Sequence, residues 1–197
     1  MKFLRFLGNE ILLGTLIAVL SVMTALSSYQ GAMADSEQNK YEILGMRNLN
    51  DGNVLYLESN QIWIQDDGNY DNWHINQFDN PEAAAYYEGN FTEALFAAME
   101  RNGADEYPID DQYVDELYAD ANSYFDESES NFDLGAQYDE RGDFLQLVVM
   151  IMALGLAFAA WASLMKEESN MRLVFAFFSI LTLIMGIIAY IKAPVVG

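Results

Sequence analysis

The sequence predicts an all-α membrane protein with three transmembrane helices and an extramembrane antiparallel helical hairpin domain. Three long apolar runs predict the transmembrane helices, and one long polar segment between the first two runs predicts the domain. Roughly 20 apolar residues are enough to cross the hydrocarbon core of a bilayer, where each backbone amide must be paired within its own helix. We therefore expect three helical crossings and the two chain ends on opposite sides of the membrane.

The first span belongs to segment 1–34, together with a short N-terminal end. Its apolar run contains no charged residue before Asp35. Lys2 and Arg5 precede the run, and residues 32–34 have the small-x-small form of a signal-peptide cleavage site. The run is longer than the core of a secretory signal, so we interpret it as an uncleaved membrane anchor.

The polar domain is predicted at 35–143. This segment contains 27 acidic and four basic residues, so its formal charge is −23 within a chain of net charge −21. Phosphate backbones are bound through Lys and Arg, and a surface this negative excludes nucleic acid as a partner. The acidic, lysine-poor composition resembles the surfaces of proteins from salt-loving archaea, in which concentrated salt screens the repulsion between carboxylates.

Helix signals divide the domain into elements. Apolar residues between Asp35 and Gln65 recur at helical spacing, which predicts that the first helix continues beyond the membrane. Gly45 and Gly52 are its predicted weak points. A turn signal at 66–69 predicts its end, and residues 68–80 are predicted to form a loop.

A second helix is predicted from Pro81 to Arg101. Asn80 can cap its start, Pro81 suits the first helical position, and Gly103 supplies a stop. After Pro108 a further apolar face predicts a helix that continues directly into the second span, with Gly135 and Gly142 as weak points. The faces that we expect to be buried contain Ala84, Tyr87, Phe91, Leu95, Ala98 and Met99 in the former helix, and Tyr113, Leu117, Ala121, Tyr124 and Phe125 in the latter.

The remaining segments are the second span at 144–165, a cytoplasmic turn at 166–172, and the third span with a short outer tail at 173–197. Basic residues near span ends are retained in the cytoplasm, and Lys166 and Arg172 flank this turn. A cytoplasmic turn agrees with a cytoplasmic N-terminal end, which is indicated by the basic residues before the first span. The sequence thus predicts a multi-pass protein of the cell membrane, with a cytoplasmic N-terminus and residues 35–143 outside.

The spans themselves favour packing over transport. No ionisable residue lies deep within any of them, so the sequence offers no proton relay. Gly155, Ala159 and Ser163 are spaced four residues apart, which predicts close contact with a neighbouring helix. The candidate neighbours are the first span, the third span and another subunit, and the third span is the default because a short turn joins it to the second.

No pattern identifies a catalytic, cofactor-binding or metal site, and we predict a protein that is not an enzyme. His74 is the only histidine, and we interpret it as a loop residue packed beside Trp73. The chain has no cysteine, which excludes thiolate sites and disulfides.

Two weaker motifs remain open in the polar domain. Oxygen-rich loops can bind calcium, and the loop 66–80 contains Asp66, Asp67, Asp71 and Asp79. Carboxylate clusters more often simply solvate a surface. Residues 90–92 match a glycosylation acceptor, but they fall in the middle of the predicted helix, where a chance match is the simpler interpretation.

The order of segments resembles a family of uncharacterised prokaryotic membrane proteins. The resemblance is carried by Leu13 to Lys40, by Tyr56-x-x-Ser-Asn-Gln-Ile-Trp, and by Phe144 to Ile188 around the charged turn. It implies one N-terminal span, an outer helical hairpin and two C-terminal spans, and it implies no activity. The chain departs from this layout between Asp66 and Gly103.

Our leading functional hypothesis is a non-enzymatic membrane scaffold or accessory subunit whose outer domain mediates protein contacts. The expected partners are the lipid bilayer and other membrane-protein subunits or further copies of the chain. Ten of the twelve tyrosines, with Trp63 and Trp73, lie in the polar domain, and such side chains are enriched in protein interfaces. The alternative is an outward-facing ligand or cation sensor coupled to the spans.

Overall fold

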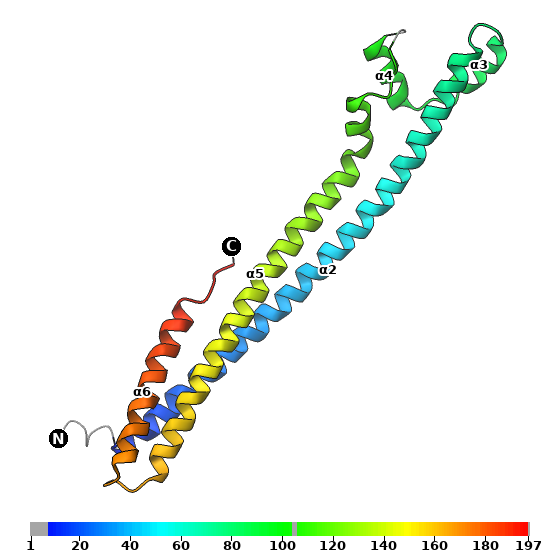
Figure 1. Cartoon of the computed structure of the whole chain (residues 1–197). Coiled ribbons are helices and arrows are strands. Elements are labelled where there is room, and N and C mark those ends of the chain that lie inside the picture. Colours follow the sequence, from blue (N-terminus) through cyan, green and yellow to red (C-terminus); the bar gives the residue numbers. More distant parts are fainter. Residues whose placement is uncertain (1–7, 104–105, 197) are drawn as a thin grey trace. The chain divides into compact units, whose positions relative to one another are not determined.

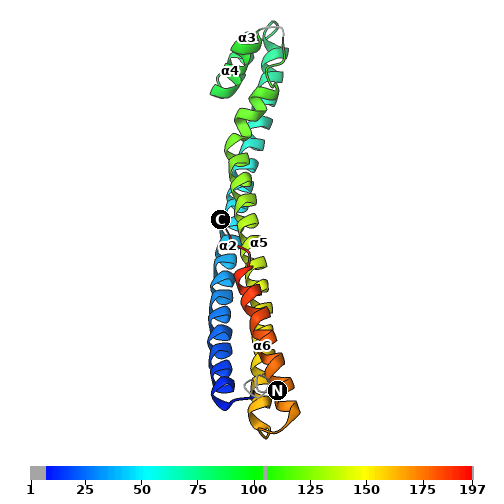
Figure 2. The same ribbon diagram turned by 90° about the vertical axis from the view of Figure 1, so that its left-hand side faces the viewer.

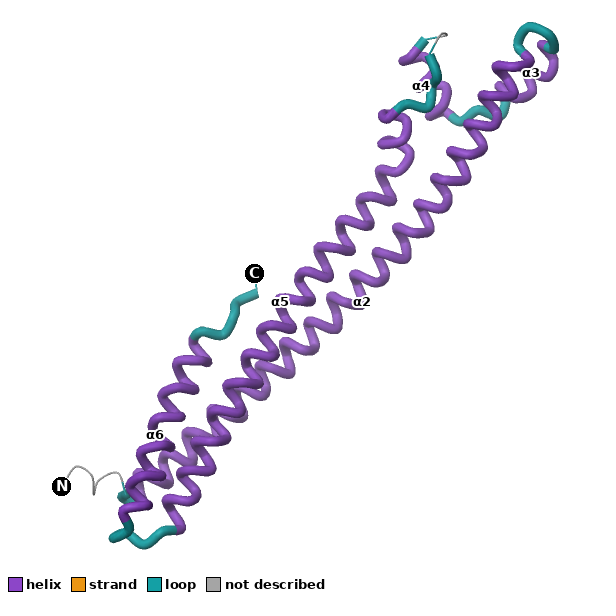
Figure 3. Tube along the Cα trace, viewed as in Figure 1, coloured by secondary structure: helices purple, strands orange, loops and turns teal. Residues whose placement is uncertain are grey.

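The computed structural model describes residues 8–103 and 106–196, and within these ranges the protein is all-α, with 86% helix and no strand (Figure 3). The all-α prediction is thereby confirmed. Figure 1 shows the helices coloured in chain order from blue to red. They are α2 (Glu10–Asn76), α3 (Pro81–Glu88), α4 (Glu93–Asn102), α5 (Asp111–Leu164) and α6 (Asn170–Ile191).

Three of the described helices, α2, α5 and α6, are long and apolar enough to cross a membrane. This finding, which concerns length and composition, confirms the three candidate spans. The ends differ slightly from the prediction, since α5 ends at Leu164 and α6 begins at Asn170. Lys2 and Arg5, on which part of the orientation depends, lie outside the described residues.

The chain divides into two compact units. Unit 1 comprises Met1–Glu42 and Phe132–Gly197, and unit 2 comprises Ile43–Asn131. Both α2 and α5 contribute residues to each unit.

Unit 1 is a three-helix arrangement in which α6 lies beside α2 and α5 (Figures 1 and 2). Its buried core combines Leu20 of α2 with Met152 of α5 and Ala176 of α6. Gly155 permits the close approach, because a Cβ atom added there would lie 2.9 Å from Leu20 Cδ2 and would also crowd Thr182 of α6. The predicted contact of the second span with the third is found at Gly155 and Ala159, and the first span shares it, but Ser163 is exposed and its hydroxyl donates to the carbonyl of Ala160 in its own helix.

Arg172 ties the three helix ends of unit 1 together. Its side chain is buried, and its Nε atom donates a hydrogen bond of 2.8 Å to the carbonyl oxygen of Gly8. Its Nη1 atom donates another of 2.8 Å to the carbonyl of Met165, just after α5 ends. The starts of α2 and α6 and the end of α5 therefore lie together.

In unit 2, α2 and α5 run antiparallel along a seam of small residues. The buried residues of α2 include Gly45, Gly52 and Ser59, each seven positions after the one before, and α5 places Ala121 and Ser128 at the same interval. Seven residues are close to two helical turns, so such residues share one face. The seam therefore has a small residue at each of these positions.

Contacts across the seam show that the two helices approach closely at Gly45, Gly52 and Ser59. The hydroxyl of Ser128 donates to the carbonyl of Gly45 at 2.8 Å, and a matching bond joins Ser59 to the carbonyl of Leu117 at 2.8 Å. A Cβ atom added at Gly52 would lie 2.8 Å from the ring of Phe125. Both helices continue unbroken through their glycines, so the expected weak points are instead places of contact.

Two predicted element boundaries are wrong. Residues 68–76 were expected to be loop, but α2 continues to Asn76 because Asp66 and Tyr70 are buried in tertiary contacts. The helix expected from Pro81 to Arg101 is two helices, α3 and α4, separated at 89–92. Its predicted ends are confirmed.

The caps of these two helices explain their boundaries. The Asn80 side chain accepts a hydrogen bond from the Ala83 amide at the start of α3. At the end of α4, Gly103 adopts a φ of 82°, a conformation that favours glycine. The break arises because Thr92 has extended backbone and caps α4 through the Leu95 amide.

Candidate functional site

The best-defined polar centre of unit 2 is the buried carboxylate of Asp66. The side chain is fully shielded from solvent, and it accepts hydrogen bonds from the amide of Thr92 at 3.2 Å and from the hydroxyl of Tyr113 at 2.8 Å. The Thr92 hydroxyl donates to the same oxygen as Tyr113. A single acceptor thus joins α2, the start of α4 and α5.

The tyrosines around this centre are held in their neutral, donating form. Burial raises the pKa of Tyr113 far above its ordinary value of 10, and the hydrogen bond to Asp66 adds to the effect. The pKa of Tyr107 is raised in the same way, by burial first and then by its bond to Asp67. These groups serve as fixed donors, and neither is suited to accept a proton at neutral pH.

Asp110 forms a second polar node, between α4 and α5. Its carboxylate caps α5 by accepting the Tyr113 amide at 2.8 Å, and it pairs with Arg101 at 2.7 Å. Asn102 donates a further bond of 3.0 Å. The Arg101 bonds foremost, then those from Tyr113 and Asn102, hold the pKa of Asp110 well below its ordinary value of 3.8.

An aromatic core lies beneath these nodes. Tyr70, Phe91, Leu95, Ala98 and Tyr113 are its buried members. Of the predicted buried faces, Ala84, Phe91, Leu95, Ala98, Tyr113 and Ala121 are indeed buried, Tyr87, Met99, Leu117 and Phe125 are half-buried, and Tyr124 is exposed.

His74 lies in the last turn of α2, so its predicted loop position is wrong, although its predicted contact with Trp73 is present. Its exposed ring stacks on Tyr70 and bonds to Gln77, contacts that provide no nucleophile for it to activate. The histidine therefore has a packing role in this unit.

The carboxylates of segment 66–80, which left calcium binding open in the sequence, are dispersed by the helix. Both oxygens of Asp66 already accept bonds, and Asp67 is bonded to Tyr107. In the ranges 8–103 and 106–196, no group of three or more acidic or histidine side chains is placed to hold a metal ion. Asn90, which begins the sequence match to a glycosylation acceptor, lies exposed in the break between α3 and α4, so its predicted position in the middle of a helix is wrong.

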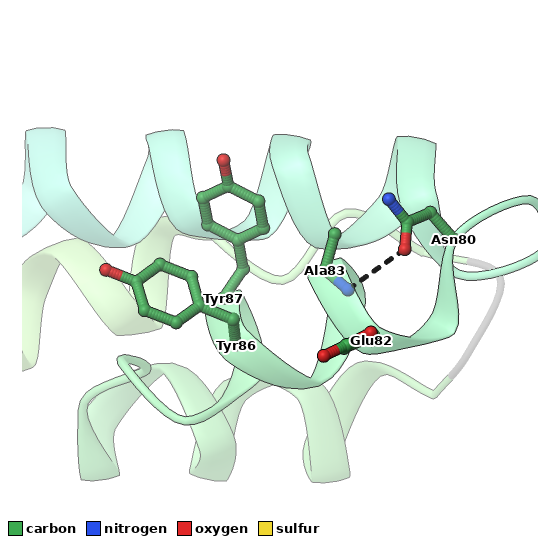
Figure 4. Close-up of a pocket in the computed structure, with 5 residues that line it drawn as sticks. All are labelled: Asn80, Glu82, Ala83, Tyr86 and Tyr87. Atoms are coloured by element: carbon green, nitrogen blue, oxygen red, sulfur yellow. Dashed lines mark hydrogen bonds between the residues drawn. The ribbon is translucent and has the colours of Figure 1, made fainter.

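A shallow hollow of about 430 Å³ lies along α3 (Figure 4). Asn80, Glu82 and Tyr86 line it, with Ala83 and Tyr87, and the only bond drawn among them is the cap from Ala83 to Asn80. One carboxylate and two phenol rings supply neither an acid-base pair nor a closed cavity. The hollow offers contact area and no catalytic chemistry.

A second hollow, of about 380 Å³, lies in unit 1 between α2 and α5. Ser27, Asp35 and Gln146 are among its polar lining residues. The Ser27 hydroxyl is buried and has no hydrogen-bond partner among the described residues. This group is too sparse to indicate a ligand.

The most unusual surface of unit 2 is the side of α2 that points away from the seam. We call it the α2 outer face, and it consists of Ile43, Met46, Asn50, Asn53, Val54, Leu57, Gln61 and Ile64, all exposed. Ile43, Leu57 and Ile64 are 67%, 60% and 63% exposed, respectively. These eight positions share one side of a helix with 3.6 residues per turn.

The α2 outer face contains no charged residue, although it belongs to a strongly acidic domain. The charged residues of this stretch of α2 are Arg47, Asp51 and Glu58, which lie on one flank, where Arg47 approaches Asp51 at 3.8 Å. On the neighbouring helix, residues 111–131 carry seven acidic residues and no basic one. Clustered exposed apolar side chains are a general feature of interaction surfaces.

Sequence reasoning missed this surface. The apolar residues between Asp35 and Gln65 were predicted to form one helical face, yet Ile43, Leu49, Ile62 and Trp63 of that set are exposed. The signal that separates the two sides is the seven-residue recurrence of small residues, which places the seam on the side of Gly45 and Gly52.

No protein-family model, curated protein or solved structure matches the chain.

Proposed function

We propose that the protein is a non-enzymatic membrane scaffold or accessory subunit whose acidic helical domain, at 35–143, mediates protein contacts outside the membrane. The observation that carries the proposal is the α2 outer face. Burying exposed Ile, Leu, Met and Val side chains against a partner is favourable by roughly 25 cal/mol per Å² of apolar surface. The face is built for contact with a protein.

The nodes around Asp66 and Asp110 support this proposal by fixing the scaffold. Their bonds join α2, α4 and α5 and leave no free acid-base pair among the residues that form them. Hydrogen bonds that hold the helices together suit docking, because less conformational entropy is lost when the partner binds.

The proposed orientation places the N-terminus and the turn at 166–172 in the cytoplasm, with the domain outside. The contact of Arg172 with Gly8 supports a common side for the turn and the N-terminal end. Basic residues near such ends are retained in the cytoplasm. Protease applied to sealed, right-side-out cells should cut within 35–143 and spare the turn, and the reverse pattern would contradict this orientation.

The function is tested by isolating the full-length protein from native membranes in mild detergent. We expect it to migrate as a complex, with further copies or with another protein at fixed stoichiometry, as measured by native mass spectrometry. Recovery as a monomer without any protein partner, at the concentration found in the membrane, contradicts the proposal.

A further inference from the structure

We propose that Asn90 is an N-glycosylation site, which receives its sugar from a lipid-linked oligosaccharide on the side of the membrane where residues 35–143 lie. The inference goes beyond the proposed function and rests on it in one respect, the outward orientation of the domain. Three observations support it: the acceptor sequence, the exposed position of Asn90 between two helices, and the contacts of the residues that follow it.

The sequence around Asn90 meets the requirement for an acceptor. Asn90-Phe91-Thr92 is the only place in the chain where Asn is followed two positions later by Ser or Thr. Such acceptors lie on surface segments outside the cytoplasm. The sequence argument against this one was its predicted position in the middle of a helix. That argument no longer applies, because residues 89–92 form the break between α3 and α4.

The fold is compatible with a sugar on the side-chain nitrogen of Asn90. The residue is exposed, and its Nδ2 atom donates a hydrogen bond of 2.7 Å to the carbonyl oxygen of Tyr86. A side-chain amide has two N–H groups, so this bond uses only one of them. An Asn that carries a sugar keeps one N–H, and the bond to Tyr86 is therefore retained in the modified protein. The backbone is held as well, because the Asn90 carbonyl accepts a bond of 3.3 Å from Asn69.

The two residues after Asn90 belong to the interior of unit 2. Phe91 is buried in the aromatic core. Thr92 caps α4 by accepting a hydrogen bond from the Leu95 amide, and its hydroxyl donates to Asp66. Asn90 is therefore the one exposed member of the motif, and a glycan attached to it displaces none of these contacts.

The contacts of Thr92 fix the order of events. Ser and Thr have the hydroxyl group in common, so recognition of the acceptor depends on this group. In folded unit 2 the Thr92 hydroxyl is engaged by Asp66 and by the Leu95 amide. The sugar is therefore transferred before Thr92 docks on Asp66. Folding then shields the hydroxyl and leaves the glycosylated nitrogen of Asn90 in solvent.

The transfer is a substitution at the anomeric carbon of the sugar. A bond forms between Nδ2 of Asn90 and C1 of the sugar, and the bond between C1 and a phosphate oxygen of the lipid carrier breaks. The lipid phosphate leaves with the bonding electrons, and one Nδ2 proton passes to a base of the membrane-bound transferase. No group is oxidised or reduced, so the co-substrate is a lipid-linked oligosaccharide phosphate alone.

The glycosylation site and the α2 outer face use different residues of unit 2. Asn50 and Asn53 lie on that face, but Gly52 and Leu55 stand two positions after them, so neither Asn is an acceptor. A glycan is bulky and solubilising. It therefore keeps the break between α3 and α4 in solvent, while the α2 outer face itself carries no sugar.

Mass spectrometry of the full-length protein, purified from native membranes in mild detergent, tests the site. We expect masses above that of the unmodified chain by whole sugar residues, and Asn90→Gln should remove this increment completely. The matched control is Asn72→Gln, which makes the same change at an exposed residue outside any acceptor sequence and should keep the increment. A wild-type protein at the unmodified mass overturns the proposal. An increment that survives Asn90→Gln also overturns it.

Variants of Thr92 and Asp66 separate recognition of the acceptor from the stability of the fold. Thr92→Val removes the hydroxyl and should abolish the glycan, whereas Thr92→Ser keeps the hydroxyl and should keep the glycan. Asp66→Asn weakens the contacts of Thr92 but leaves the acceptor sequence intact, so at least the wild-type fraction of molecules should carry the glycan. A glycan on Thr92→Val overturns the site. Its loss from Asp66→Asn shows that the folded state is recognised, and overturns the proposed order of events.

The outcomes keep this inference distinct from the proposed function, because protease applied to sealed cells reports the orientation independently of the sugar. A domain that is cut from outside and carries no glycan overturns the glycosylation site and leaves the scaffold proposal standing. A glycosylated protein that is a monomer without any protein partner does the reverse. A domain that is protected from protease and carries no glycan overturns the orientation and the glycosylation site together.

Discussion

Replacing Asp66 by Asn should destabilise unit 2 by about 3 kcal/mol. Asp66 accepts three hydrogen bonds, from the amide and hydroxyl of Thr92 and from the hydroxyl of Tyr113. A bond to a charged group contributes about 1.5–3 kcal/mol and a neutral bond about 0.5–1.5 kcal/mol, so each of the three loses about 1 kcal/mol in the amide. If the new side-chain NH₂ group faces the Thr92 amide, two donors meet and no hydrogen bond can form between them.

Urea unfolding of the full-length chain in detergent measures this loss. Trp73 lies 6.1 Å from Phe91, between ring centroids, and reports on the aromatic core once Trp63 and Trp161 are replaced by Phe. With a denaturant dependence of about 1.5 kcal/mol per M, a loss of about 3 kcal/mol lowers the midpoint by about 2 M.

The matched control is Asp71→Asn, which makes the same change at an exposed position of the same helix. Its effect should stay within about 0.5 kcal/mol. Removal of a negative charge from a crowded acidic domain is common to both variants, so their difference isolates the buried hydrogen bonds. Equal midpoints for the two variants would refute the role assigned to Asp66.

Three further predictions concern packing, pH and salt. Gly68→Ala should stabilise α2 by about 1 kcal/mol, because the space around Gly68 is open. Gly52→Ala should lose at least that gain, because the new methyl group meets the Phe125 ring. The urea midpoints of the two variants measure the difference, and an equal gain in stability for both would contradict the close contact at the seam. Because the pKa of Asp110 is lowered on folding, its ionised carboxylate contributes fully to the free energy of unfolding above pH 3.8, and this contribution is lost as the pH falls further. The difference in stability between the wild type and Asp110→Asn should therefore narrow below pH 3.8. Asp111→Asn, at an exposed position, is the control. If the acidic composition is an adaptation to concentrated salt, helix content by circular dichroism should fall in dilute buffer and recover in molar salt, and a signal independent of salt would exclude that adaptation.

The features predicted correctly from sequence are those decided by local chemistry. Asn80 and Pro81 mark a helix start, and Gly103 marks an end, because the groups that satisfy the terminal amides and carbonyls lie within a few residues. The three candidate spans can also be predicted from sequence, because length and composition alone decide whether a helix can cross lipid.

The features that sequence reasoning missed depend on distant residues. The turn signal at 66–69 is overridden because Asp66 bonds to Tyr113, which lies 47 positions later in the chain. The break before α4 depends on Thr92, whose amide and hydroxyl bond to Asp66 across 26 positions. Periodicity located the helical faces of α2, but it does not tell which of two faces is covered until the partner helix is known.

The seam of α2 and α5 also constrains how such a protein can change in length. Deleting one residue between Gly45 and Ser59 would rotate everything beyond it by about 100° and bring bulky side chains between the helices. Deleting seven from α2, with seven from the matching part of α5, restores small residue opposite small residue. Natural variants that fold should therefore differ in length by seven residues, or a multiple of seven, in both α2 and α5.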